Sequence, residues 1–272
     1  MEEVILMKTN YHTHSYRCGH AVKCLDEDYV IKAIENGYSE LGFSEHAMFS
    51  DIYNEYGMRP PYSDLEEYIN TLNNIKEKYK DKITIYKAME CEYFSEYYDE
   101  LKELIDSNKL DYLIFGNHFV AHKLGSIYTP SEIFGTDKYF DAYIDRAKEA
   151  MESKLFSIFA HPDFLYQFYN KWDSYIENRF KEVLEIAKKN NVYVELNLGG
   201  FRRGIRQYED GDRYPFPYSP LWKLIKEVGN KVVIGVDSHN PLEFDNHEEY
   251  QKAVDFANEH NIIVEERIIF NK

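Results

Sequence analysis

The chain is poor in cysteine, in basic residues and in long apolar runs. Three of its 272 residues are cysteine (Cys18, Cys24 and Cys91), and an odd number in a chain of this length indicates reduced thiols rather than a disulfide framework. No stretch approaches the ~20 apolar residues that a membrane span needs. The N-terminus carries two acids where a secretory signal has a basic region. These shortages predict a cytoplasmic protein without a membrane partner.

Positive charge is scarce as well. Lys and Arg number 32 against 48 Asp and Glu, which gives a formal net charge of −16. Sequence-independent binding to nucleic acid or anionic lipid requires a basic surface, so we expect neither as a partner. An anionic substrate would have to be met by local positive charge, which gives weight to individual arginines.

Apolar and aromatic residues are plentiful in contrast. Hydrophobic residues make up 44% of the chain and aromatic residues 16%, which is ample for a core and excludes intrinsic disorder. The length allows two domains of ~150 residues, but a single α/β barrel of ~250 residues is equally natural. No linker rich in Pro, Gly or Ser divides the chain, so we expect one domain over residues 1–272.

Short strands and amphipathic helices alternate along the chain. The expected strands are Met7–His12, Glu40–Ser44, Ile83–Met89, Tyr112–Gly116, Ser157–Ala160, Val192–Asn197 and Val232–Val236. The expected helices that follow them are Asp26–Asn36, Asp64–Tyr79, Tyr97–Asn108, Lys138–Glu152, Ser174–Lys189, Pro220–Val228 and Asn246–Glu259. Seven such units indicate a parallel sheet. We expect it to close into a barrel, the alternative being a doubly wound open sheet, although no glycine-rich fingerprint follows the first strand.

The ends of these elements carry further signals. Gly37 and Gly229 stand where helices should stop, as glycines at that position do. Glu67 follows Ser63 and Asp64 in the manner of a capping box. A last β-branched run, Ile262–Ile269, could form a closing or edge strand.

Seven of the ten histidines, together with two acids, fall at or just beyond the carboxyl ends of expected strands. They are His12, His14, His20, His46, His118, His161 and His239, with Glu90 and Asp237. The carboxyl ends of parallel strands meet on the face where α/β barrels build active sites. Imidazole and carboxylate are ligands for Zn, Mn or Fe. One histidine at a strand end is usually structural, but nine such residues at one rim indicate two or three divalent ions.

Other polar residues near the same rim have two interpretations. Glu92, Asp163 and Glu195 could be metal ligands, or they could orient ligands from behind. His122 follows the fourth expected strand and could line the mouth of the site.

The rim motifs resemble, in order, those of the polymerase-and-histidinol-phosphatase (PHP) superfamily. They are His12-Thr-His14, Phe-Ser-Glu-His46, the acid Glu90, Gly-Asn-His118, Ala-His161-Pro-Asp and Asp237-Ser-His239. Three further segments resemble the histidinol-phosphate phosphatase branch: Arg17-Cys-Gly-His20-Ala, Met58-Arg59-Pro-Pro-Tyr62, and Glu195-Leu-Asn-Leu-Gly-Gly-Phe-Arg-Arg203. The resemblance implies a distorted (β/α)7 TIM-like barrel, the PHP fold, with a trinuclear metal site.

The resemblance also implies how the ligands are shared among three divalent ions, whether Zn, Mn or Fe. The first ion would bind His12, His14, Glu90 and Asp237, and Glu90 would bridge to a second ion held by His118 and His161. The third ion would bind His20, His46 and His239. We expect Glu90, Asp237 and His239 to be the catalytic members of this set.

Arginines near the rim are candidates for gripping phosphate, because a guanidinium offers a planar fork of donors that suits its oxygens. The candidates are Arg202, Arg203, Arg59 and Arg17. The chain departs from the resembling branch at one point, because no basic residue follows His161 before Lys171.

These features predict a metal-dependent phosphomonoesterase acting on a small molecule, with L-histidinol phosphate, from histidine biosynthesis, as the expected substrate. A hydroxide bridging two metals would attack phosphorus in line, and the leaving alkoxide would be protonated by a third-metal water, Asp163 or His122. One alternative is a nucleotide phosphatase or exonuclease on the same site, and another is a catalytically silent metal-binding module. The sequence predicts no particular oligomeric state.

Overall fold

The computed structural model describes residues 8–52 and 57–271. A parallel seven-stranded sheet forms its centre, with the strands in the order β1-β2-β3-β4-β7-β8-β11. Their bounds are β1 Lys8–Asn10, β2 Tyr38–His46, β3 Thr84–Cys91, β4 Tyr112–Phe115, β7 Ile158–Phe159, β8 Tyr193–Asn197 and β11 Val232–Gly235. All seven expected strands are found, although Met7, where the first was expected to begin, lies outside the described residues.

The first and last strands approach each other, so the sheet curves into a nearly closed barrel. Beyond the strands proper, Thr13 and Ser238 form a parallel bridge. The amide of His14 donates to the carbonyl of Ser238 over 2.8 Å, and the amide of Ser238 donates to the carbonyl of His12 over 3.3 Å. The expected parallel barrel is therefore confirmed, and the open-sheet alternative is wrong.

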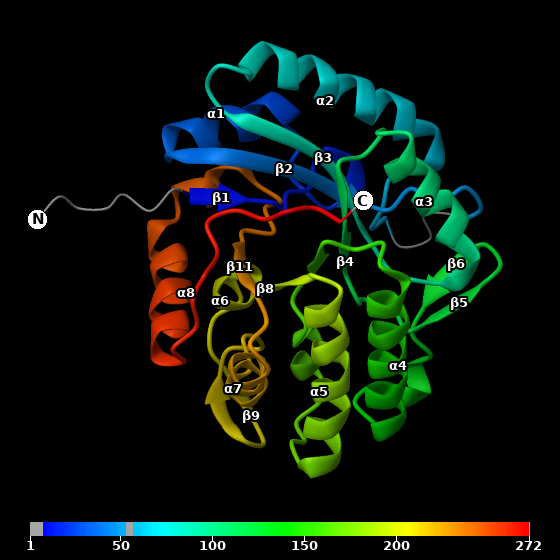
Figure 1. Cartoon of the computed structure of the whole chain (residues 1–272), viewed down its shortest axis with the longest axis vertical. Coiled ribbons are helices and arrows are strands. Elements are labelled where there is room, and N and C mark those ends of the chain that lie inside the picture. The colour runs from blue at the N-terminus through cyan, green and yellow to red at the C-terminus, as the bar shows by residue number, and fades with distance from the viewer. Residues whose placement is uncertain (1–7, 53–56, 272) are drawn as a thin grey trace, which may run out of the picture.

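Seven helices match the expected ones to within a few residues. They are α1 Asp26–Glu35, α2 Leu65–Tyr79, α3 Tyr98–Asp106, α4 Asp137–Ser153, α5 Ser174–Lys189, α7 Ser219–Val228 and α8 His247–Glu259, and they lie around the outside of the sheet (Figure 1). Each buries an apolar stripe, as Tyr139, Phe140 and Tyr143 do on α4. None of the helices in the described part of the chain is long and apolar enough to span a membrane.

The expected helix ends are only partly found. Gly37 and Gly229 both have φ of +77°, the left-handed conformation that ends a helix. The capping box before α2 is wrong, because the Asp64 side chain caps no backbone amide. Glu67 instead forms an ion pair with Arg17.

Three elements in the loops at the carboxyl side of the strands were not predicted. The helix α6, Leu198–Arg202, follows β8 directly. Two hairpins are formed by β5 Ala121–Lys123 with β6 Ser126–Tyr128, and by β9 Arg206–Tyr208 with β10 Gly211–Arg213. Their strands are too short for an alternating pattern to be recognised.

The C-terminal segment is not a strand of the barrel, contrary to expectation for Ile262–Ile269. Within the described structure, its one β-bridge to the sheet joins Val264 to Val232. Beyond α8 the segment, red in Figure 1, runs back across the barrel. The ring of Phe270 stacks on Tyr112 with centroids 4.4 Å apart, and the amide of Ile268 donates to the hydroxyl of Tyr11 over 3.4 Å. The segment thus packs against the aromatic residues of the barrel interior.

Candidate metal centre

The structure brings together all nine residues that the sequence singled out as metal ligands. Six strand ends supply eight of them: His12 and His14 after β1, His46 on β2, Glu90 on β3, His118 after β4, His161 after β7, and Asp237 and His239 after β11. His20 follows the short 3-10 turn Tyr16–Cys18. The seventh strand, β8, contributes Glu195 to the same region.

Glu90 lies at the middle of the cluster and is 2% exposed. Its Oε2 is 3.3 Å from a ring nitrogen of each of His12, His14 and His46. Its Oε1 is 2.9 Å from His161 Nε2 and 3.4 Å from His118 Nε2. Burial alone would raise the pKa of Glu90, but the neighbouring His118 and His12 hold this pKa well below its usual range.

Glycine makes room for this carboxylate. A Cβ at Gly116 would lie 2.3 Å from Glu90 Oε1 and 2.6 Å from its carboxyl carbon. Any larger residue at the end of β4 would therefore displace Glu90 from the cluster centre.

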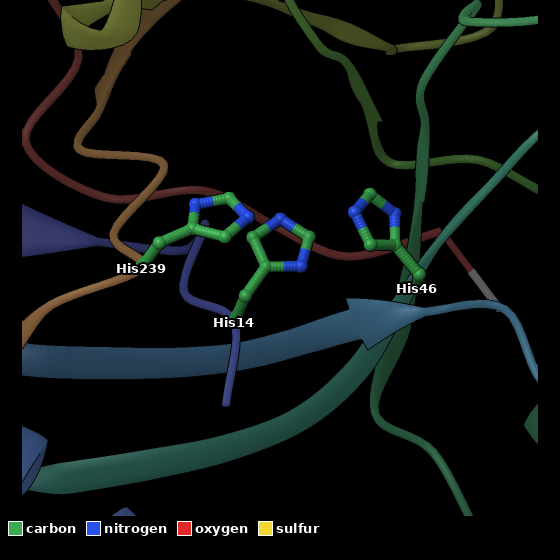
Figure 2. A group of neighbouring side chains, drawn as sticks. All are labelled: His14, His46 and His239. Atoms are coloured by element: carbon green, nitrogen blue, oxygen red, sulfur yellow. The ribbon is translucent and has the colours of Figure 1, made fainter. Parts of the chain in front are cut away.

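Three imidazoles from three separate segments, His14, His46 and His239, lie side by side (Figure 2). The ring of His14 stands between His46 and His239, with its centroid 4.2 Å from each. Beyond them, His239 Nε2 is 2.9 Å from His20 Nε2. The cluster therefore extends from the buried His14 to the exposed His20 at the rim.

A second group of ligand atoms surrounds Asp237. The Oδ1 atom of this residue is 3.5 Å from His12 Nε2 and 3.3 Å from His14 Nε2. Asp237 has φ of +51° and His161 has φ of +30°, which is uncommon for residues other than glycine. Such local strain is characteristic of functional sites, where the surrounding structure holds it in place.

The donor set fits divalent cations. Five sets of three side chains have ligand atoms within 4.8 Å of one another: His14-His46-His239, Cys18-His20-His239, His12-Glu90-His161, His12-His14-Asp237 and His46-Glu90-His118. Within the described residues, the ion pairs of Glu90 and Asp237 are all with histidines, and none is with lysine or arginine. The buried Nδ1 atoms of His14 and His161 have no hydrogen-bond partner there. Imidazoles facing buried carboxylates in this way make a suitable metal site.

Two of the histidines are hydrogen-bonded to buried carboxylates, and a third lies near one. His12 Nδ1 is 2.8 Å from Glu195 Oε1, and His118 Nδ1 is 3.1 Å from Glu92 Oε1. His14 Nδ1 lies 3.6 Å from Glu45 Oε1. Carboxylates in this position fix the tautomer and orientation of a ligating imidazole. Glu92 and Glu195 thus lie behind histidines, which favours a role in orienting these ligands over a role as metal ligands.

Two supporting residues were missed by the sequence reasoning. Asn197 donates to Glu195 Oε2 over 2.8 Å and to Asp237 Oδ2 over 3.3 Å, and so joins two parts of the cluster. Glu45 accepts from the backbone amide of Ser15 over 2.9 Å. The available signal for Glu45 was an acid at a buried strand end, next to His46.

Asp163 and His122, two of the candidates for the general acid, are engaged elsewhere. Asp163 Oδ2 accepts from the amide of Tyr218 and from the Trp222 indole, each over 2.7 Å, so it anchors the loop after β10. Burial raises the pKa of Asp163. His122 Nε2 is 2.8 Å from the hydroxyl of Tyr97.

The four arginines differ sharply in their surroundings. Arg17 is buried and bonds to Asp26 over 2.8 Å and to Glu67 over 2.9 Å. These two carboxylates face its guanidinium, and its contact with phosphate stays a prediction.

Arg202 is likewise engaged. It contacts Glu243 and Glu249 at 3.2 Å each, and it donates to the carbonyls of Val236 over 3.0 Å and Asp237 over 3.3 Å. It holds the end of β11 in place, and its contact with phosphate stays a prediction.

Arg59 and Arg203 lie closer to the candidate ligands. Arg59 is 6% exposed and bonds to Glu92 over 3.1 Å. Arg203 is exposed and forms no ion pair with any described carboxylate, although its Nη1 donates to the carbonyl of Gly199 over 3.0 Å. A Cβ at Gly199 would be 3.1 Å from Arg203 Nη1 and 3.4 Å from Asp237 Oδ2, so this guanidinium lies beside the ligand cluster.

The fold and the site together define a metal-binding α/β barrel. Residues 10–198 match the PHP domain family, and the chain belongs to that family. A probable histidinol-phosphatase of Schizosaccharomyces pombe is 26% identical over 252 residues, which cover 86% of this chain and 81% of the relative. The histidinol-phosphatase of Lactococcus lactis is 25% identical over 250 residues, covering 86% of this chain and 85% of the relative.

A solved structure has the same fold. The crystal structure of histidinol phosphate phosphatase from Lactococcus lactis, complexed with Zn, L-histidinol and phosphate, superposes with a TM-score of 0.65 at 20% identity. The match covers 96% of this chain and 98% of that one. The expected PHP fold is thereby confirmed.

Proposed function

We propose that the chain is a metal-dependent phosphomonoesterase that hydrolyses L-histidinol phosphate to L-histidinol and phosphate, a step of histidine biosynthesis. The observation that carries this proposal is the convergence of seven imidazoles and two carboxylates, Glu90 and Asp237, on one rim of the barrel. Membership of the PHP domain family and the two histidinol-phosphatase relatives support the choice of substrate.

Three divalent ions would share the nine ligands in this proposal. His12, His14 and Asp237 would hold the first together with Glu90, and Glu90, His118 and His161 would hold the second. His20, His46 and His239 would hold the third. Zn, Mn or Fe would suit these ligands. When bound, such ions supply Lewis acidity toward the phosphoryl oxygens and lower the pKa of water toward ~7.

The chain's own residues would hold the substrate in line for this chemistry. Arg203 is the arginine best suited to grip the phosphoryl oxygens, because its guanidinium is exposed beside Asp237 without a described carboxylate partner. A charge-assisted hydrogen bond of this kind is worth about 1.5–3 kcal/mol. Glu195 and Glu92 would keep His12 and His118 in the orientation that leaves their Nε2 atoms facing Glu90.

The alternative substrates, nucleotides and single-stranded DNA, find little support in the loop that carries most arginines. Arg202 is paired with Glu243 and Glu249, and Arg213 is paired with Asp210 at 3.0 Å. The basic track that a nucleic acid would need is therefore largely neutralised.

Phosphate release tests the proposal. The protein loaded with Zn, Mn or Fe would be assayed on L-histidinol phosphate, p-nitrophenyl phosphate and a 3′,5′-bisphosphonucleotide, with Glu90→Gln as the blank. We expect a strong preference for L-histidinol phosphate that the variant loses. Arg203→Met should raise KM and weaken inhibition by inorganic phosphate roughly 10- to 100-fold, the equivalent of one charge-assisted bond. Preference for the bisphosphonucleotide would refute the substrate assignment and retain the metal site.

A further inference from the structure

One buried ion pair behind the metal cluster has a geometry that neither phosphate binding nor folding stability explains. Arg59 Nη2 donates to Glu92 Oε2 over 3.1 Å, and the other oxygen of the same carboxylate, Oε1, is 3.1 Å from His118 Nδ1. Arg59 is 6% exposed and Glu92 is 1% exposed. The guanidinium thus reaches a candidate ligand, His118, through a carboxylate that accepts from both.

The same guanidinium also contacts a second strand end. Arg59 Nη1 donates to the carbonyl of Ala47 over 3.2 Å, and Ala47 directly follows the candidate ligand His46. In turn, the amide of Ala47 donates to the carbonyl of Glu90 over 2.9 Å. Arg59 therefore links the backbone beside His46 and Glu90 to the carboxylate behind His118, so that one side chain connects three candidate ligands.

The pair is poorly placed to act through stability alone. Removing two charges from water costs about as much as the pair recovers, so a buried ion pair adds little to folding free energy. The two other carboxylates behind histidines have different partners. Glu195 is held by the amide of Asn197 and Glu45 by Ser15, and no ion pair joins either of them to an arginine within the described residues.

We propose that Arg59 is a positioning residue that fixes the orientation of His118 through Glu92, and that it does not bind the substrate phosphate. The expected effect on kinetics rests on the proposed function, whereas the expected effect on metal affinity rests on the ligand cluster alone. One arm of the Arg59 guanidinium fork holds the Glu92 carboxylate and the other holds the Ala47 carbonyl. The carboxylate in turn holds the imidazole so that Nε2 faces Glu90.

Metal affinity is the first measurement, because it does not depend on turnover. Binding of Zn to the metal-free full-length protein would be followed by competition with a chromophoric chelator. Loss of such a supporting contact typically weakens metal binding or activity 10- to 100-fold. We expect Arg59→Met and Glu92→Gln each to weaken the binding of one ion by roughly this factor, and the double variant to be no worse than either single one. Arg59→Lys should recover only part of the loss, because an ammonium lacks the fork.

Steady-state kinetics separates positioning from phosphate binding. With metals at saturation, Arg59→Met should lower kcat on L-histidinol phosphate while the inhibition constant of inorganic phosphate stays at the wild-type value. Arg203→Met, in the same assay, should show the opposite pattern. Arg179, on the outer helix α5, is paired with Asp145 on α4. The control Arg179→Met should change neither metal affinity nor kinetics.

Each arm has an outcome that overturns the proposal. Wild-type metal affinity in both Arg59→Met and Glu92→Gln would show that the pair does not position His118. Phosphate inhibition weakened tenfold in Arg59→Met, with metals bound, would make Arg59 a substrate-binding residue. Absence of turnover on every phosphoester by the wild-type protein would refute the proposed function instead, while the metal titration would still decide the role of Arg59.

Discussion

Replacing Gly116 by alanine tests whether the position of Glu90 governs the whole centre. The added Cβ would lie 2.3 Å from Glu90 Oε1, 2.6 Å from its carboxyl carbon and 2.7 Å from Cγ, whereas an ordinary contact begins at 3.4 Å. The carboxylate must therefore move by about 1 Å. Misplacement of a reacting group by 1 Å costs about 100-fold in rate, and overpacking costs about 1–3 kcal/mol of folding free energy. We expect kcat to fall roughly 100-fold with all nine candidate ligands still present.

The assay compares kcat, metal content and the free energy of unfolding in urea for Gly116→Ala and for a control of similar instability. Gly37→Ala is that control, because its φ of +77° strains an alanine while its Cβ would meet nothing within 4 Å. The control should lose stability and keep kcat. A Gly116→Ala protein with wild-type kcat and metal content would refute the central role assigned to Glu90.

Three further outcomes are expected. Chelation of the metal should lower the melting temperature, because Glu90 and Asp237 would lose the cation that balances their charge. An ion present at 1,000 times its Kd contributes about 4 kcal/mol to the free energy of unfolding. A melting scan in which added Zn restores the melting temperature is the check. The pKa values of Tyr68, Tyr112 and Tyr143 are raised by burial well above 10.0, so the stability gained from their neutral forms is present below pH 10 and lost above it. Spectrophotometric titration should show a group of phenols that ionise only on unfolding, and gradual ionisation of all 25 tyrosines in the folded state would contradict this. Phe270→Ala should cost about 2 kcal/mol in urea unfolding, less than a fully buried phenylalanine, whereas Ile269→Ala, 78% exposed, should cost under about 0.5 kcal/mol.

The sequence was sufficient for the barrel and for the ligand cluster because both depend on local pattern. The alternation of short apolar runs with amphipathic stretches corresponds to the seven strands and the helices that follow them. Ligands such as His46 and Glu90 could be located because the carboxyl ends of parallel strands necessarily share one face. Their convergence follows from topology, and it needs no knowledge of side-chain contacts.

The roles of the arginines could not be predicted in this way. Besides the nearby Asp26, Arg17 is paired with Glu67, which lies 50 residues away in sequence, and Arg202 is paired with Glu249, 47 residues away. No local pattern identifies such partners, because they are set by how helices and loops pack around the barrel. The segment Ile262–Ile269 has the composition of a strand. Only its position across the barrel shows that it does not extend the sheet and that Ile268 packs with Tyr11 and Tyr112 instead.

The seam between the first and last strands has a consequence for the order in which the protein is assembled. His20 and His239 face each other across 219 residues of sequence, and the seam itself is joined by few backbone hydrogen bonds, whereas β2 and β3 pair over seven residues. Closing so long a loop has an entropic cost, which is offset only when the last strand forms its contacts with the first. Candidate ligands lie on both sides of the seam, so a chain still emerging from the ribosome holds an incomplete set until its final quarter is made. Metal uptake would then report completion of the fold, and an ion held between His12 and Asp237 would act as a crosslink whose removal exposes the seam amides to hydrogen exchange before those of β2 and β3.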